Sequence, residues 1–83
     1  MNKEQTIHIR YYALLREERG VSDETLKTLA QTPKELYKEL GDRYNFRLKE
    51  NLLKVAVNDS FANWDAPLKN NDTVVFIPPV SGG

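Results

Sequence analysis

The predicted fold is organised around the stretch Thr73-Val74-Val75-Phe76-Ile77-Pro78-Pro79 near the C-terminal end of the chain. β-branched and aromatic residues favour extended backbone, so residues 73–77 are expected to form a strand. Its unbroken apolar run is typical of a central strand with both faces covered. Neither proline can donate a ladder hydrogen bond, so the strand must end at Ile77 and the chain must leave the sheet in a stiff, extended direction.

Four further segments have strand character: residues 6–12, 24–29, 53–58 and a short return strand beginning at Phe61. The first and third alternate between apolar and polar residues, which is typical of half-buried strands. Their predicted inward side chains are Ile7, Ile9, Tyr11, Leu53, Val55 and Val57. The segment 24–29 has the weakest pattern, because Leu26 and Leu29 are out of phase. Asn58-Asp59-Ser60 supplies turn residues before the return strand.

One main helix is predicted after residue 32. Thr32 is placed as its N-cap, Pro33 as its first residue, and Glu35 as the third helical residue, which is capping-box spacing. The apolar stripe that follows consists of Leu36, Tyr37, Leu40 and Tyr44. Asn45 is a suitable left-handed residue for the C-terminal end. The element order predicts an α+β fold, in which this helix packs on one face of the sheet.

Length and composition limit the function. The chain has 83 residues, enough for one small domain without a deep catalytic cleft. Lys plus Arg and Asp plus Glu number 12 each, so the basic excess of a nucleic-acid-binding protein is missing. With no cysteine and only His8, neither a thiol nucleophile nor a metal cluster is expected. No apolar run approaches the roughly 20 residues that cross a membrane, and the N-terminus is unlike a signal peptide, so we expect a cytoplasmic protein.

The tail Val80-Ser81-Gly82-Gly83 is the strongest candidate for the functional site. We expect residues 1–77 to form the domain and residues 78–83 to form an exposed tail, which can reach at most about 20 Å. Two glycines leave the α-carboxylate of Gly83 without neighbouring side chains, so that it could thread a narrow channel in another protein. A carboxylate becomes a good electrophile when ATP converts it to an acyl-adenylate.

The whole string from Ile77 to Gly83 resembles the C-terminus of the small, sulfur-carrying subunit of molybdopterin synthase, a member of the ubiquitin-like β-grasp superfamily. Residues 11–17 resemble that family's first strand and following loop, and Gly20 lies where a glycine is common. The similarity continues through Val55-Ala56-Val57-Asn58, Asp65-Ala66-Pro67-Leu68 and Asn71-Asp72-Thr73-Val74. Asn71 occupies a position where glycine is usual, which slightly alters the expected turn. The resemblance implies a β-grasp fold with a mixed sheet.

The resemblance also implies a carrier that is not an enzyme by itself. An E1-like adenylyltransferase would activate the Gly83 carboxylate with ATP, and a sulfur donor would convert it to a thiocarboxylate. The tail would then enter the large subunit of molybdopterin synthase, in a heterotetramer of two small and two large subunits. There the sulfur would pass to cyclic pyranopterin monophosphate. The implied small subunit binds no cofactor, nucleic acid or membrane, and the missing cysteine agrees with sulfur carried on the terminal carbonyl carbon.

A docking patch is predicted from strand alternation. If Tyr11 and Phe76 face the helix, Tyr12 and Ile77 lie together on the opposite face of the sheet. With Phe61 they would form an apolar patch of the kind that marks a partner site, and the family resemblance implies that both partners dock there. Arg16 is the polar candidate for the same contact.

Other candidate residues are interpreted as structural. We expect His8 to be a solvated strand residue and the acidic pairs Glu17-Glu18 and Asp23-Glu24 to be solvated charges rather than a catalytic pair. Nucleophilic chemistry is not expected at Ser22, Ser60 or Ser81, because the chain has no second histidine to form a relay with them. Trp64 could be an exposed anchor or part of the core.

Three alternative functions stay open: a sulfur carrier for thiamine thiazole synthesis, a ubiquitin-like modifier attached to lysines, and a plain β-grasp binding module. The approach Pro78-Pro79-Val80-Ser81 favours the molybdopterin branch over the first of these.

Overall fold

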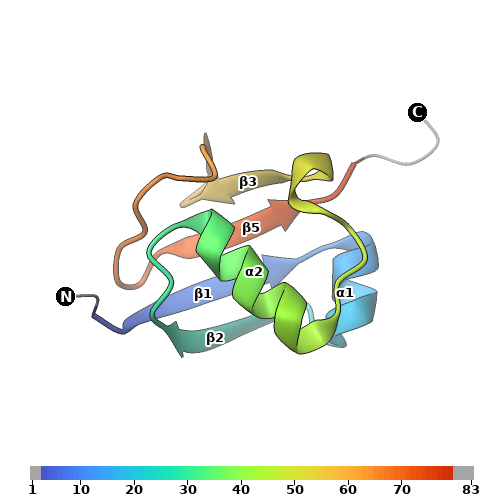
Figure 1. The fold of residues 1–83 in the computed structure, drawn as a ribbon, viewed down its shortest axis with the longest axis horizontal. Helices are drawn as coiled ribbons and strands as arrows, with labels where there is room; N and C mark the ends of the chain where they lie inside the picture. Colours follow the sequence, from blue (N-terminus) through green and yellow to red (C-terminus); the bar gives the residue numbers. More distant parts are fainter. Residues whose placement is uncertain (1–2, 80–83) are drawn as a thin grey trace.

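The computed structural model describes residues 3–79, which form a five-stranded mixed sheet, two α-helices and a short 3-10 helix (Figure 1). The strands are β1 (Gln5–Tyr11), β2 (Asp23–Thr28), β3 (Lys54–Val57), β4 (Ser60–Ala62) and β5 (Thr73–Ile77). The helices are α1 (Ala13–Arg19), α2 (Pro33–Tyr44) and the 3-10 helix η1 (Glu50–Leu52). The predicted second strand is therefore present, beginning at Asp23 and ending before Leu29.

The strand order is β2-β1-β5-β3-β4, so β5 is the central strand as predicted. β1 and β5 run parallel, with Ile9 opposite Val74 and Tyr11 opposite Phe76. The other neighbouring strands are antiparallel. Three antiparallel strand pairs and one parallel central pair, with one main helix across a single face of the sheet, form a β-grasp domain. The expected α+β class and mixed sheet are confirmed.

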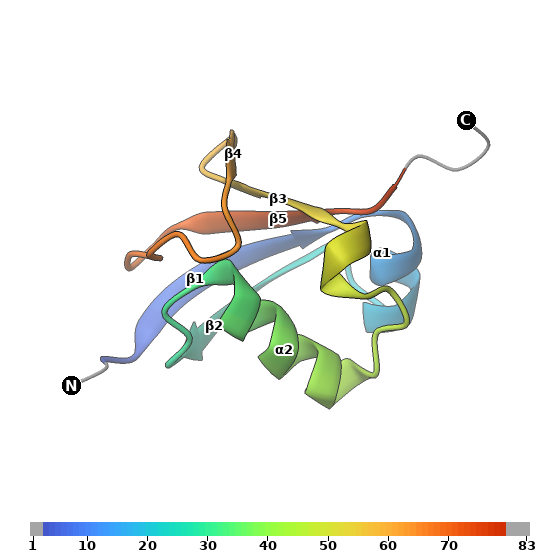
Figure 2. The same cartoon turned by 45° about the horizontal axis from the view of Figure 1, so that its top comes forward.

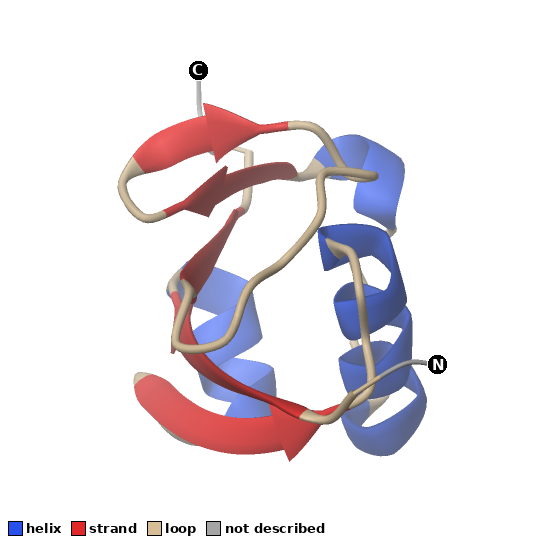
Figure 3. Ribbon diagram, turned by 90° about the vertical axis from the view of Figure 1, so that its left-hand side faces the viewer, coloured by secondary structure: helices blue, strands red, loops and turns tan. Residues whose placement is uncertain are grey.

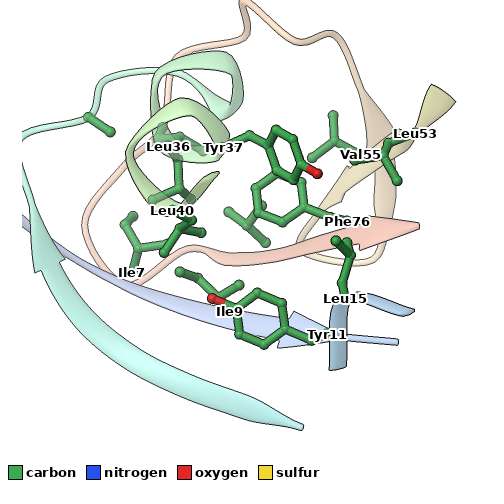
Figure 4. Packing of buried hydrophobic residues seen from close by; sticks show 13 residues of the cluster. Ile7, Ile9, Tyr11, Leu15, Leu36, Tyr37, Leu40, Leu53, Val55 and Phe76 are labelled. Atoms are coloured by element: carbon green, nitrogen blue, oxygen red, sulfur yellow. The ribbon is translucent and has the colours of Figure 1, made fainter. Parts of the chain in front are cut away.

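The core lies between α2 and one face of the sheet (Figures 2 and 3). Figure 4 shows Leu36, Tyr37 and Leu40 of α2 pointing toward the side chains of the strands. The predicted inward residues Ile7, Ile9, Tyr11, Leu53 and Val55 are all buried, whereas Val57 is half-buried. Trp64 belongs to this side of the sheet, because its ring stacks on Phe76 with a centroid distance of 5.8 Å.

One expectation for β5 is wrong. Val74 and Phe76 are buried under α2, but Thr73, Val75 and Ile77 on the opposite face are only half-buried. No helix within residues 3–79 covers that face (Figure 3). The apolar run therefore serves two purposes: alternate residues fill the core, and the remaining ones give the free face of the sheet an apolar character. Such a surface is typical of a site that a partner covers.

The segment after β1 was expected to be a loop, and the structure corrects this to the helix α1. Leu15 is completely buried, which explains why the segment packs against the end of the sheet (Figure 1). The helix has only seven residues and Tyr12 makes no side-chain cap, so the usual sequence signals of a helix start are missing. Gly20 ends the helix in the left-handed conformation at φ 87°, which glycine adopts without steric cost.

The start of α2 follows the prediction closely. The Thr32 side chain accepts a hydrogen bond from the backbone N–H of Glu35 at 3.2 Å. The Glu35 carboxylate accepts from the backbone N–H of Gln31 at 2.7 Å, one residue earlier than in a standard capping box. Asn45 closes the helix in the left-handed conformation at φ 57°. Asn71 takes the same conformation at φ 71°, so asparagine supplies the positive φ that glycine would otherwise provide.

Replacing Thr32 should destabilise the domain through loss of this cap. Thr32→Ala is expected to lower the free energy of unfolding by about 0.5–2 kcal/mol, because one N–H group of the first turn loses its acceptor. Thr32→Ser keeps the oxygen and serves as the control. Urea unfolding followed by circular dichroism measures both variants, and equal stability of Thr32→Ala and the wild type would contradict the assignment.

Candidate functional site

A groove of about 600 Å³ lies on the sheet face opposite α2, beside the end of β5. Its lining residues come from β3, β4 and β5, the β3–β4 turn, the junction between β1 and α1, and the two prolines after β5; they are Tyr12, Ala13, Ala56, Asp59, Phe61, Val75, Ile77, Pro78 and Pro79. Only Asp59 among them carries a charge. A concave surface this apolar on an 83-residue chain is the best candidate for a binding site in residues 3–79.

The three apolar residues of the predicted docking patch meet in this groove. Tyr12 and Phe61 are exposed, at 47% and 74% of their full accessible surface, and Ile77 lies between them in the lining. Their predicted juxtaposition is confirmed, and their role in binding a partner stays a prediction. Arg16 is exposed but does not line the groove; it borders a smaller hollow of about 200 Å³ that also includes Tyr12.

The strand register explains how the groove forms. Ala56 is opposite Phe61 across β3 and β4, and it is opposite Val75 across β3 and β5, so the three side chains share one face. The small side chain of Ala56 leaves room between its larger neighbours. Sequence reasoning missed Ala56 and Val75 because their place in the groove depends on the pairing of distant strands. Strand alternation, which identified Ile77, was the available signal for Val75.

The β3–β4 turn holds the position of Phe61. Asn58 and Asp59 have φ values of 52° and 70°, and two positive φ values in a two-residue turn are typical of a type I′ hairpin. The Asn58 side chain donates to the buried Asp72 at 2.8 Å and accepts from the backbone N–H of Thr73 at 3.0 Å. These hydrogen bonds therefore connect the hairpin to the start of β5.

The predicted tail residues Val80, Ser81, Gly82 and Gly83 lie outside the described part of the chain. Pro78 and Pro79 are the last described residues, and both line the groove. The first two residues of the predicted tail 78–83 therefore belong to the groove, and Pro78 is half-buried rather than exposed. The remaining four residues follow directly after the groove along the chain.

Glu24 was expected to be a solvated charge, and this expectation is wrong, because two side chains bind its carboxylate. Arg19 donates to its two carboxylate oxygens at 2.8 and 2.9 Å, and the Tyr11 hydroxyl donates to the same group. The hydrogen bonds from Arg19 hold the pKa of Glu24 below its usual value, and burial raises the pKa of Tyr11. The cluster links α1 to β2 and lies on the helix side of the sheet, so its role is structural.

Loss of the Glu24 charge should make stability less dependent on pH. Because the folded-state pKa of Glu24 is lowered, its contribution is present above the usual pKa of 4.5 and is lost as pH falls through the folded-state value. Glu24→Gln should cost on the order of 1 kcal/mol at neutral pH and much less at about pH 3. Urea unfolding at both pH values measures the loss of unfolding free energy. Glu17→Gln, on the exposed side of α1, is the control. The prediction is wrong if Glu24→Gln lowers the free energy of unfolding equally at the two pH values.

His8 lies on the free face of the sheet, outside the groove. The Nδ1 atom of His8 lies 2.8 Å from the Thr25 hydroxyl on the free sheet face, away from the groove. No helix in residues 3–79 combines the length and the apolar character needed to cross a bilayer.

A comparison with protein families identifies the chain. The family model described as the ThiS family matches residues 9–83. The chain belongs to the ThiS family. The match includes every residue of the groove and the whole Gly-Gly tail, so the resemblance inferred from the tail and the upstream segments is confirmed at the level of the family.

Individual relatives within and around the ThiS family agree with this. The molybdopterin synthase sulfur carrier subunit of Haemophilus influenzae is 30% identical over 80 residues, covering 93% of this chain and 99% of that protein. A solved complex of subunits 1 and 2 of the molybdopterin-converting factor from Helicobacter pylori contains a chain that is 26% identical with a TM-score of 0.67, covering 95% of this chain and 100% of that one.

Small archaeal modifier protein 1 from Methanosarcina acetivorans has the same fold, with a TM-score of 0.77 at 20% identity over 98% of this chain and 99% of that one. At this identity the similarity shows the fold alone. The ThiS-family fold is therefore shared with a protein named as a modifier, and function has to be argued from the site.

Proposed function

We propose that this ThiS-family chain is a sulfur carrier in molybdenum cofactor biosynthesis and that the groove is where its partners dock. The observation that carries the proposal is the continuity of the groove with Pro78 and Pro79, which lead directly into the Gly-Gly tail. The relative from Haemophilus influenzae, a named sulfur carrier subunit aligned over 99% of its length, supports the same function.

The proposed cycle begins with ATP on an E1-like adenylyltransferase. The Gly83 carboxylate attacks the α-phosphorus of ATP, and pyrophosphate leaves as the acyl-adenylate forms. Hydrosulfide supplied by a donor then attacks the acyl carbon of the adenylate, AMP leaves, and a thiocarboxylate remains on Gly83. In the large subunit of molybdopterin synthase this sulfur passes to cyclic pyranopterin monophosphate, and water restores the carboxylate. The chain needs no cofactor of its own, and its use of ATP through the enzyme is consistent with a cytoplasmic location.

The geometry of the groove supports docking followed by insertion of the tail. The four residues after Pro79 can extend by at most about 14 Å, so the partner's reaction centre must lie within that distance of the groove's edge. Val80, Ser81 and Gly82 act as the spacer in this proposal, and their small side chains suit a narrow channel. Acid–base groups for the transfer belong to the partner, because the groove of this chain offers only Asp59.

The test is a reconstituted reaction that separates the alternatives. The chain is incubated with the activating enzyme, ATP and a sulfur donor, and its intact mass should increase by the exchange of one oxygen for sulfur. Addition of the large subunit and cyclic pyranopterin monophosphate should return the original mass and yield molybdopterin. Sulfur delivery only to a thiazole synthase, or covalent attachment of the chain to lysines, would assign the function to one of the other carriers. If the mass of the chain does not change at all, the plain β-grasp binding module is the alternative that remains.

A further inference from the structure

Two opposite charges mark the two ends of the groove. Lys54 is the first residue of β3 and is directly opposite Ile77, the last residue of β5. Its ammonium nitrogen lies 5.8 Å from the centre of the Phe61 ring. Asp59 lines the groove from the tip of the β3–β4 hairpin. Lys54 thus stands beside the point where the tail begins, and Asp59 stands at the far end of β3.

Neither charge has a partner within the described residues. The four ion pairs among residues 3–79 involve other side chains, and both Lys54 and Asp59 are exposed. Lys54 and Asp59 are also not paired with each other, so each charge is available to a group on a docked protein.

An apolar groove alone does not determine in which direction a docked protein lies along it. Burial of apolar surface is non-directional, so an apolar side chain of a partner could enter the groove from either end. Charges at an interface contribute specificity and register, because like charges brought together cost free energy. A partner that covers Lys54 and Asp59 removes water from both and must supply an anion at one end and a cation at the other.

We propose that Lys54 and Asp59 set the direction in which the large synthase subunit lies along the groove. The large subunit presents a carboxylate to Lys54 beside the tail and a basic side chain to Asp59 at the hairpin tip. The reversed arrangement brings like charges together at both ends. The correct arrangement directs the tail toward the reaction centre. This inference rests on the proposed function, since it takes the large subunit as the occupant of the groove.

Calorimetry with the purified large subunit from the same organism tests the proposal. Lys54→Glu should raise the dissociation constant about tenfold or more, and Lys54→Met, which keeps the apolar stem, should raise it less. Asp59→Asn should also weaken binding; asparagine is chosen because it tolerates the positive φ at this position. Lys34→Glu, an exposed substitution at the start of α2 on the other side of the sheet, is the matched control and should leave binding unchanged.

The outcomes separate this inference from the proposed function. The inference is supported if Lys54→Glu and Asp59→Asn both lower the affinity for the large subunit and if this loss becomes smaller at high salt, as expected for opposite charges on the partner. Tighter binding by either variant, or affinities equal to that of Lys34→Glu, overturns the inference while leaving the carrier function in place. Failure of the wild-type chain to bind the large subunit overturns the proposed function and this inference with it. Circular dichroism of each variant verifies that the domain is folded.

Discussion

A chain without Gly83 is expected to fold and to dock on its partners but to carry no sulfur. The deletion moves the terminal carboxylate back by about 3.5 Å, although the groove residues are unchanged. A displacement of about 1 Å in aligned reacting groups can cost on the order of a hundredfold in rate, so activation should fall below detection. The intact mass of the shortened chain after incubation with activating enzyme, ATP and sulfur donor measures this.

A steric variant tests the same hypothesis without changing the length of the tail. Gly82→Ile places a β-branched side chain next to the reactive residue, where a narrow channel should exclude it. Stability should be nearly unchanged in both variants, because residues 80–83 follow the last strand of the domain. Normal thiocarboxylate formation on the chain that lacks Gly83 would show that another group carries the sulfur.

The second large effect is expected at Ile77. Ile77→Asp should abolish association with the large subunit, because a carboxylate in an apolar contact must lose its water when the partner docks. Loss of a central contact residue commonly costs 2 kcal/mol or more, which is a change of about thirtyfold or greater in the dissociation constant. The free domain should stay folded, since Ile77 is only half-buried and Lys54 directly opposite offers the new carboxylate a cation.

Thr73→Asp is the matched control for this substitution. Thr73 is on the same strand and on the same face as Ile77, but it lies outside the groove. Calorimetry should therefore show near wild-type binding for Thr73→Asp and none for Ile77→Asp. Equal binding by the two variants would exclude the groove as the docking site, and sulfur transfer would then have to use another surface.

The parts of the fold that were predictable depend on local patterns. The capping residues Thr32 and Glu35 and the alternation of Ile7, Ile9 and Tyr11 act over a few residues, and the sequence displays them directly. α1 was missed because burial of Leu15 against the sheet, rather than a cap or a long stripe, stabilises it. Tertiary contacts of this kind leave little trace in a single sequence.

The part of the candidate site that depends on strand alternation was predictable, and the part that depends on strand pairing was not. Alternation places Tyr12 and Ile77 on the free face without knowledge of which strands are neighbours. Ala56, Asp59 and Lys54 could not be assigned, because their proximity depends on the pairing of β3 with β4 and β5. The error about the two faces of β5 has a different cause, because an apolar run does not indicate whether a helix covers both faces of the strand or only one.

β5 is hydrogen-bonded on one side to β1 and on the other to β3, and the groove is complete at Pro79. A protease that removed only the residues after Pro79 would therefore leave a folded domain with an intact docking surface. Such a clipped chain would occupy the large subunit without delivering anything to it. We expect it to act as a competitive inhibitor of its own intact form, so that partial proteolysis would reduce cofactor synthesis by more than the fraction of chains lost.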